Sequence, residues 1–131
     1  MTIEKNCERQ AELSVIQPFT FADFVSGADT PAVQVPGGAI VTGGDFIIDT
    51  AFDSTVSDTF TIGDATVGNR YGAAIDGQAA ARTALVPTGF KYPTQDNVTL
   101  NWTGAGDAPT AGAGRLIMRY VVDGRAQTTQ G

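Results

Sequence analysis

The sequence contains no histidine and only one cysteine among its 131 residues. Without histidine, neither a Ser-His-Asp triad nor a Cys-His pair can form. Cys7 has no second cysteine to pair with, and we expect it to be a solvent-exposed, reduced thiol rather than a nucleophile. No apolar run approaches the roughly 20 residues that a membrane-spanning helix needs. We therefore expect neither an enzyme of the common nucleophilic classes nor a membrane protein.

Basic residues are also few, with 8 Lys and Arg against 14 Asp and Glu, for a net charge of -6. Affinity for nucleic acids and for anionic membranes comes mainly from Lys and Arg, so the sequence disfavours both as partners. The first apolar run is short and follows a charged stretch, which predicts no signal peptide and synthesis in the cytoplasm.

Glutamate is confined to the first dozen residues, at Glu4, Glu8 and Glu12, and every later acidic residue is aspartate. Glutamate suits helices, whereas aspartate suits turns because its short side chain bonds to nearby backbone. We interpret residues 1–12 as a flexible N-terminal arm, with two or three helical turns available to residues 3–12. Residues 13–131 form one domain, whose apolar content suffices for a single core.

The body of the chain shows short segments in which apolar and polar residues alternate, as in half-buried strands. Pro18 interrupts the first segment and predicts an edge strand or a bulge, while Gly43-Gly44 predicts a hairpin turn. The small-residue stretch 65–84 is interpreted as a crossover with helical turns near residues 78–84. The predicted strands cover residues 13–21, 32–35, 39–42, 45–52, 59–62, 97–103 and 115–123.

Seven or eight short strands at roughly ten-residue spacing are typical of an antiparallel sandwich or barrel. The predicted fold is therefore all-β, a single antiparallel β-sandwich of jelly-roll type. The pairing of the strands does not follow from the sequence.

The aspartates allow two alternative functions, glycoside hydrolysis and calcium binding. A carboxylate pair could hydrolyse glycosides, but most aspartates stand beside Gly or Thr at predicted turns, where capping is the simpler role. Calcium is the second alternative, because Asp45 and Asp49 share a strand face and other aspartates flank the neighbouring turns. We predict no catalytic residue, no metal ligand and no cofactor.

Aromatic residues distinguish a sugar-binding surface from a packed core. Trp102 is in phase with Val98 and Leu100, which places it in the core rather than on a sugar-stacking platform. Phe90 and Tyr92 lie near prolines and are the better candidates for exposed aromatics, which are enriched in interfaces.

The order of several segments over residues 33–126 resembles the small head-decoration, or cement, proteins of tailed bacteriophages. The segments that carry the resemblance are Val35–Gly44, Thr50–Ser54, Ser57–Asp64, Arg70-Tyr71, Pro87–Tyr92 and Tyr120–Arg125.

The resemblance implies a jelly-roll-like sandwich on the outside of an assembled capsid, where it bridges neighbouring capsomers. It implies the major capsid protein as partner, a homo-oligomer of two or three copies and a place in the virion, with no catalytic motif. The alternative is a carbohydrate-binding β-sandwich module, either at the tip of a fibre or head fibre or as a free module. The residues that we predict to contact the capsid or another copy are Lys5, Arg9, Arg70, Tyr71, Phe90 and Tyr92.

Overall fold

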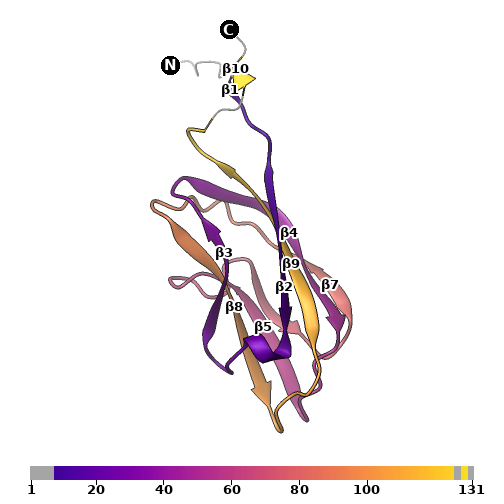
Figure 1. Cartoon of the computed structure of the whole chain (residues 1–131). Coiled ribbons are helices and arrows are strands. Elements are labelled where there is room, and N and C mark those ends of the chain that lie inside the picture. Colours follow the sequence, from indigo (N-terminus) through magenta and orange to yellow (C-terminus); the bar gives the residue numbers. More distant parts are fainter. Residues whose placement is uncertain (1–7, 126–127, 130–131) are drawn as a thin grey trace.

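The computed structural model describes residues 8–125 and 128–129. Two four-stranded antiparallel sheets pack face to face, and a two-stranded ribbon projects from one end of the sandwich (Figure 1). The strands are β1 (Glu8–Arg9), β2 (Leu13–Thr20), β3 (Asp29–Val35), β4 (Ala39–Thr50), β5 (Ser57–Gly63), β6 (Gly72–Asp76), β7 (Ala81–Ala84), β8 (Asp96–Ala105), β9 (Ala113–Val122) and β10 (Thr128–Thr129), with a 3-10 turn η1 (Phe21–Asp23) after β2.

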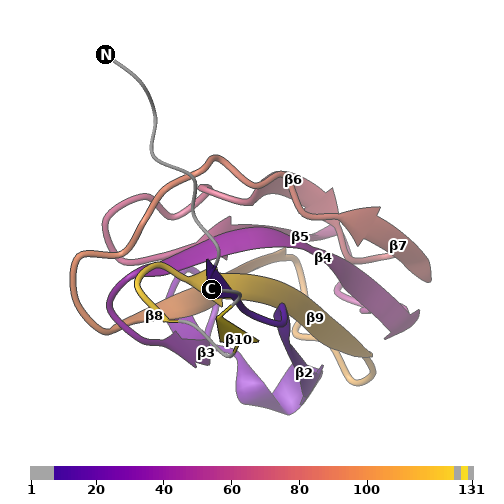
Figure 2. The same cartoon turned by 90° about the horizontal axis from the view of Figure 1, so that it is seen from above.

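The strand order confirms the jelly roll. One sheet has the order β2-β9-β4-β7 and the other β3-β8-β5-β6, so the chain passes repeatedly from one sheet to the other. This is the double Greek-key arrangement of eight strands in two sheets. Seen from above, β2 and η1 lie on the side of the sandwich opposite β6 and β7 (Figure 2).

The core between the sheets is rich in phenylalanine. Phe60 contacts Phe46 and Phe52, with ring centroids 5.0 and 5.1 Å apart, and Phe19 stacks on Phe46 at 5.4 Å. Such aromatic pairs add to the free energy gained by burying their area. Trp102 is 7 % exposed, which confirms its predicted place in the core.

The edge position predicted from Pro18 is confirmed, because β2 is the outer strand of its sheet. The hairpin predicted at Gly43-Gly44 is wrong: β4 runs without interruption from Ala39 to Thr50, with a register shift between Val41 and Gly43. Instead of forming a turn, these glycines allow the backbones of β4 and β9 to approach each other closely. A Cβ on Gly44 would lie 2.2 Å from the carbonyl oxygen of Ile117.

The helical turns predicted near residues 78–84 are also wrong. Residues 65–84 contain the edge strands β6 and β7, which pair with β5 and β4. Alanine favours helices in isolation, but pairing with an existing sheet overrides that preference.

The helical turns allowed for residues 3–12 are wrong where the structure describes this segment, because Glu8–Arg9 form β1, which pairs with β10. Gln10 anchors this ribbon: its side-chain amide donates to the carbonyl oxygens of Val122 and Arg125, both at 2.7 Å, and accepts from the Val122 N–H at 3.0 Å. Lys5 and Cys7 lie outside the described residues.

No helix among the described residues has the length and apolar character that a membrane crossing requires.

Candidate functional site

Four of the six predicted contact residues meet at one place, around the carboxylate of Asp64. Asp64 follows the last residue of β5, and the loop after it brings Arg70 and Tyr71 back towards the same carboxylate. Phe90 and Tyr92 reach it from the segment between β7 and β8. We call Asp64, Arg70, Tyr71, Phe90 and Tyr92 the Asp64 cluster.

Hydrogen bonds occupy both oxygens of Asp64. Oδ1 accepts from the backbone N–H groups of Thr66 and Val67 at 3.0 and 2.8 Å, which closes the loop as an aspartate turn. Oδ2 accepts from Arg70 Nε at 2.5 Å and from the Tyr92 hydroxyl at 2.9 Å. The carboxylate therefore joins the loop after β5 to the segment that precedes β8.

The two tyrosines extend this network into the core. The hydroxyls of Tyr71 and Tyr92 lie 2.8 Å apart, and because Tyr92 donates to Asp64, Tyr71 donates to the Tyr92 oxygen. Both side chains are 1 % exposed, so the exposure predicted for Tyr92 is wrong. Its neighbouring prolines suggested a surface loop, but its hydroxyl finds a charged acceptor inside the molecule, which permits burial.

Arg70 and Phe90 form the outer layer of the cluster. The guanidinium carbon of Arg70 lies 3.7 Å from the ring centroid of Phe90, a cation-π contact. Phe90 in turn meets the ring of Tyr92 edge-on, with centroids 5.0 Å apart. The Arg70 side chain is 11 % exposed, and Phe90 is half-buried. These two residues are the part of the cluster that reaches the surface.

The pKa directions suit a structural network rather than acid-base catalysis. Burial raises the pKa of Asp64, but the hydrogen bonds from Arg70, Val67 and Tyr92 outweigh it, so the net pKa lies below its usual value. Burial, the largest cause, raises the pKa of both Tyr71 and Tyr92. At neutral pH the carboxylate stays charged and both phenols stay protonated, and a useful general acid or base would need a pKa near the working pH.

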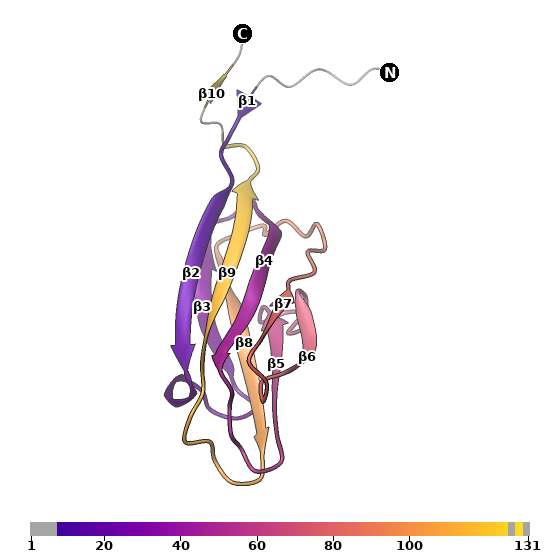
Figure 3. The ribbon, with the colours of Figure 1, turned by 90° about the vertical axis from the view of Figure 1, so that its right-hand side faces the viewer.

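The strands β1 and β10 emerge from the end of the sandwich at which β4 begins and β9 ends (Figures 1 and 3), and the Asp64 cluster is linked to this end by the segment that carries Tyr92. The backbone of Tyr92 bonds to Gly38 and Ala39, at the start of β4. Lys91 forms an ion pair with Asp123 at 3.0 Å, just past the end of β9. We call this end, formed by Gln10, Gly37–Ala39, Arg70, Phe90–Tyr92 and Val122–Arg125, the stalk end.

A second buried network surrounds Asp58, which is 1 % exposed. Its Oδ1 accepts from Trp102 Nε1 at 2.8 Å and from the Ser54 hydroxyl at 2.7 Å. Its Oδ2 accepts from the Ser54 N–H at 3.0 Å and from the Gln78 amide at 3.2 Å. No local pattern around Asp58 reveals that one of its partners is Trp102, 44 positions away.

The aspartates considered for calcium are engaged with arginines. Asp45 pairs with Arg82 at 2.6 Å and Asp49 with Arg115 at 3.0 Å. Within residues 8–125 and 128–129, no three His, Cys, Asp or Glu side chains gather as metal ligands would. Buried Trp102 offers no platform on which a sugar could stack.

The remaining predicted contact residues belong to the arm. Arg9 is exposed and lies in β1, beyond the sandwich (Figure 1). Lys5 is outside the described residues. Sequence reasoning missed Asp64 as the centre of the cluster, although its place between Gly63 and a small-residue loop marked it as a turn residue.

Comparison with known proteins finds similarity only at the level of structure. No protein-family model matches the chain, and no curated protein sequence matches it. A chain of the capsid of Ralstonia phage GP4 is 19 % identical, with a TM-score of 0.66 over 95 % of this chain and 92 % of that one.

Two further capsid structures contain similar chains. A chain of the cyanophage Pam1 capsid asymmetric unit is 18 % identical, with a TM-score of 0.66 over 85 % of this chain and 84 % of that one. A chain of the acid-stable capsid of Helicobacter pylori bacteriophage KHP30 is 17 % identical, with a TM-score of 0.66 over 85 % and 87 %. At these identities, what the chain shares with them is the jelly-roll fold.

Proposed function

We propose that this chain is a non-enzymatic structural protein of a phage virion that binds the outside of the assembled capsid and cements neighbouring capsomers. The observation that carries the proposal is the fold: at least 85 % of the chain superposes on chains found in three phage capsids. The position on the outside of the capsid comes from the resemblance of the segments between residues 33 and 126 to head-decoration proteins.

The proposed partner is the major capsid protein, contacted by a homo-oligomer of two or three copies. A protein that binds only the assembled shell stabilises that shell by mass action, because disassembly must first release it. This role requires a rigid body with fixed surface loops. The Asp64 cluster supplies such rigidity, since it ties two loops to one buried carboxylate.

The stalk end is the proposed contact surface. It presents Arg70 and Phe90 at the surface, and the ribbon with Arg9 projects from it. Tyr71 and Tyr92 are buried, so in this proposal they hold Arg70 and Phe90 in place instead of touching the capsid. Lys5, four residues before Arg9, belongs to the same proposed arm.

The first experiment is a copy count of this protein in purified virions of the phage that encodes it, by quantitative mass spectrometry against the major capsid protein. A copy number comparable to that of the capsid protein is expected. A few copies per particle would assign the chain to a fibre, tail or portal instead, and its absence from virions would refute the proposal.

A second experiment tests the arm. Deletion of residues 1–9 removes Lys5 and Arg9 but keeps the Gln10 hydrogen bonds and the contact between Glu12 and Thr42. We expect weaker co-sedimentation with capsids that lack the protein, and an unchanged thermal midpoint. Unchanged binding would remove the arm from the proposal while leaving the copy count to judge the rest.

A further inference from the structure

The strand β2 is a free edge of its sheet. It pairs with β9 on one side, and Figure 3 shows no strand of the described chain beyond it on the other. In an antiparallel sheet, alternate residues direct their N–H and C=O groups to opposite sides of the strand. Once the partners of a few backbone groups are known, the direction of every other N–H and C=O group of the strand follows.

Ile16 directs its backbone groups away from β9. Its cross-strand partner, Ile117, turns its carbonyl oxygen towards β4, where a Cβ on Gly44 would lie 2.2 Å from it. Ile16 and Ile117 are thus a pair that exchanges no hydrogen bonds, and both turn their backbone groups outward from each other. By alternation, Ser14, Pro18 and Thr20 face the free edge together with Ile16.

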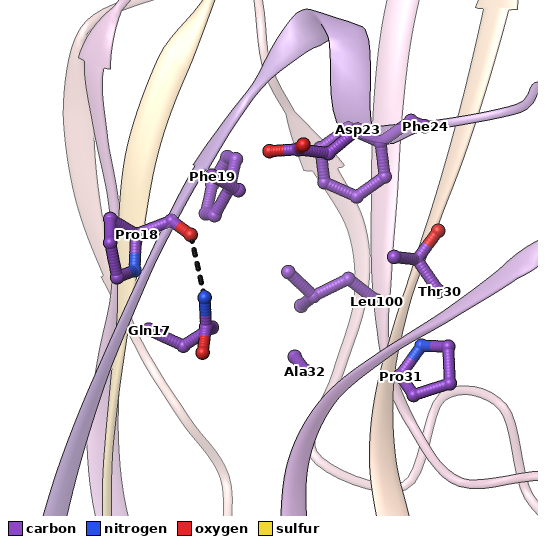
Figure 4. Close-up of a pocket in the computed structure, with 9 residues that line it drawn as sticks. All are labelled: Gln17, Pro18, Phe19, Asp23, Phe24, Thr30, Pro31, Ala32 and Leu100. Carbon is purple, nitrogen blue, oxygen red and sulfur yellow. Dashed lines mark hydrogen bonds between the residues drawn. The ribbon is translucent and has the colours of Figure 1, made fainter.

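The second half of this edge is closed. Pro18 has no N–H to offer, and its carbonyl oxygen accepts from the Gln17 side chain at 2.9 Å (Figure 4). The N–H of Thr20 donates to Asp23 Oδ2 at 2.7 Å. Proline and capped groups of this kind prevent another strand from pairing with an exposed edge.

The first half of the edge is open. No hydrogen bond within the described part of the chain uses the outward N–H and C=O of Ser14 or Ile16. The strand Leu13–Thr20 carries no charge, and the side chain of Ile16 is 61 % exposed. A neutral strand with free backbone groups and an exposed isoleucine is suited to pairing with another strand.

The other three edges are less suited to pairing. Strand β3 contains Asp29 and Pro31 and shifts register after Pro31. Strand β7 has four residues, one of them Arg82, and β6 ends at Asp76 and pairs irregularly with β5. Charge, proline and irregular register all oppose strand addition. The open half of β2 is therefore the sheet edge best suited to pairing with a strand of a partner.

We propose that Leu13–Gln17 pairs antiparallel with the same segment of a second copy of this chain, about a two-fold axis at Val15. Ser14 of each copy exchanges two hydrogen bonds with Ile16 of the other, giving four in all. The two Val15 side chains lie directly opposite each other on the inner face. The two Ile16 side chains meet diagonally on the outer face, which covers the exposed isoleucine.

The geometry favours a second copy over an unrelated strand. The free groups at Ser14 and Ile16 are symmetric about Val15, so the segment is its own complement, as a two-fold interface requires. Pro18 of each copy falls opposite Glu12 of the other and ends the ladder there. The β2-β9-β4-β7 sheet of one copy and the same sheet of the other then form one continuous eight-stranded sheet. The pairing needs no capsid, so it can be tested on the purified protein alone.

Disulfide trapping tests the register. In a Cys7→Ser background, Val15→Cys should form an intermolecular disulfide, because Cα atoms of a directly opposed pair without hydrogen bonds lie about 4.5 Å apart, within disulfide range. Gln17→Cys is the matched control, since it lies on the same side of β2 but would face Leu13 of the second copy. Equal cross-linking of both variants, or of neither, would overturn the proposed pairing.

Sedimentation of the purified protein tests the interface. We expect a dimer, and Ser14→Pro should raise its dissociation constant about 30-fold by removing two of the four hydrogen bonds. The substituted N–H faces the free edge, so the ladder with β9 stays intact. Ile16→Lys should also weaken the dimer, while Val86→Lys, at a site with similar exposure of 66 %, should not.

The proposal would be refuted by a monomer at all concentrations or by a trimer. It would also be refuted by a dimer whose dissociation constant neither β2 variant changes. If Ser14→Pro fails to fold, Ile16→Lys and the cysteine pair still decide the question.

Discussion

Removing the Tyr92 hydroxyl should destabilise the fold more than removing that of Tyr71, although both are equally buried. The Tyr92 hydroxyl donates to the Asp64 carboxylate and accepts from Tyr71. A hydrogen bond to a charged group contributes about 1.5–3 kcal/mol, and a buried hydroxyl left without a partner costs about 1 kcal/mol or more. Tyr92→Phe incurs both losses, so we expect the free energy of unfolding to fall by about 3 kcal/mol.

Tyr71→Phe removes only the bond between two neutral hydroxyls and leaves Tyr92 bound to Asp64. We expect it to cost about 1 kcal/mol. The double variant should be no less stable than Tyr92→Phe alone, because the Tyr71 hydroxyl loses its acceptor in that variant already. Tyr120→Phe, at a half-buried tyrosine of β9, is the matched control and should change stability by less than about 0.5 kcal/mol.

The assay is urea unfolding followed by the fluorescence of Trp102, with linear extrapolation to water. The reasoning would be refuted if Tyr71→Phe were the more harmful change, or if Tyr92→Phe could not be told apart from the Tyr120→Phe control. Additive losses in the double variant would show that the two hydroxyls do not form one network.

The other predictions concern pH and packing. Because the pKa of Asp64 lies below its usual 3.8, its contribution to stability is present above pH 3.8 and is lost as the pH falls further. Asp64→Asn should therefore reduce the slope of stability against pH in this acid range. Asp53 and Asp123, whose pKa values are also lowered, contribute to the same slope. Tyr71 and Tyr92 have raised pKa values, so stability should decline above pH 10, where the unfolded chain ionises first, and Tyr92→Phe should weaken this decline in urea titrations at high pH. Gly63→Ala should cost about 3 kcal/mol, because its Cβ would lie 2.2 Å from the Val67 carbonyl oxygen, whereas Gly68→Ala has open space and should fold normally in thermal denaturation. Acrylamide should quench Trp102 fluorescence poorly in the native protein and fully in urea, and strong native quenching would contradict its 7 % exposure.

The sequence predicted those elements whose pattern is local. The alternation from residue 97 to 103 places Val98, Leu100 and Trp102 on one face, and the structure buries all three within β8. Pro18 predicted an edge because a missing N–H has a direct consequence for pairing. The predicted number of strands came close to that of the sandwich only because two errors offset each other: β4 was split into two strands, and β6 and β7 were missed.

The errors arose where distant contacts decide the conformation. Gly43-Gly44 has the composition of a hairpin turn, but the close approach of the Ile117 carbonyl requires glycine in the middle of a strand. The alanines of residues 65–84 favour a helix until β4 and β5 offer a pairing edge. Neither effect can be seen in a window of ten residues.

In the candidate site, too, the sequence indicates individual residues but not the contacts between distant parts of the chain. Arg70, Tyr71, Phe90 and Tyr92 were singled out as loop residues, the last two also as candidate exposed aromatics, but nothing local indicates that they meet. Tyr92 bonds to Tyr71 from 21 positions away and to Asp64 from 28. Burial of Tyr92 depends on these bonds, so its local surroundings suggested exposure.

The ribbon of β1 and β10 has a mechanical consequence. Both strands leave the sandwich at the same end, and β2 and β9, which continue them, are neighbours in one sheet. A force that pulls β1 and β10 away from each other would open the β2–β9 ladder one pair at a time, instead of shearing all eight pairs at once. After the two β1–β10 pairs, the Gln10 amide, with its three bonds to Val122 and Arg125, is the next contact to bear such a load. Separating the two strands from each other would therefore need less force than pulling both of them together out of the sandwich, which would load the β4–β9 ladder in shear.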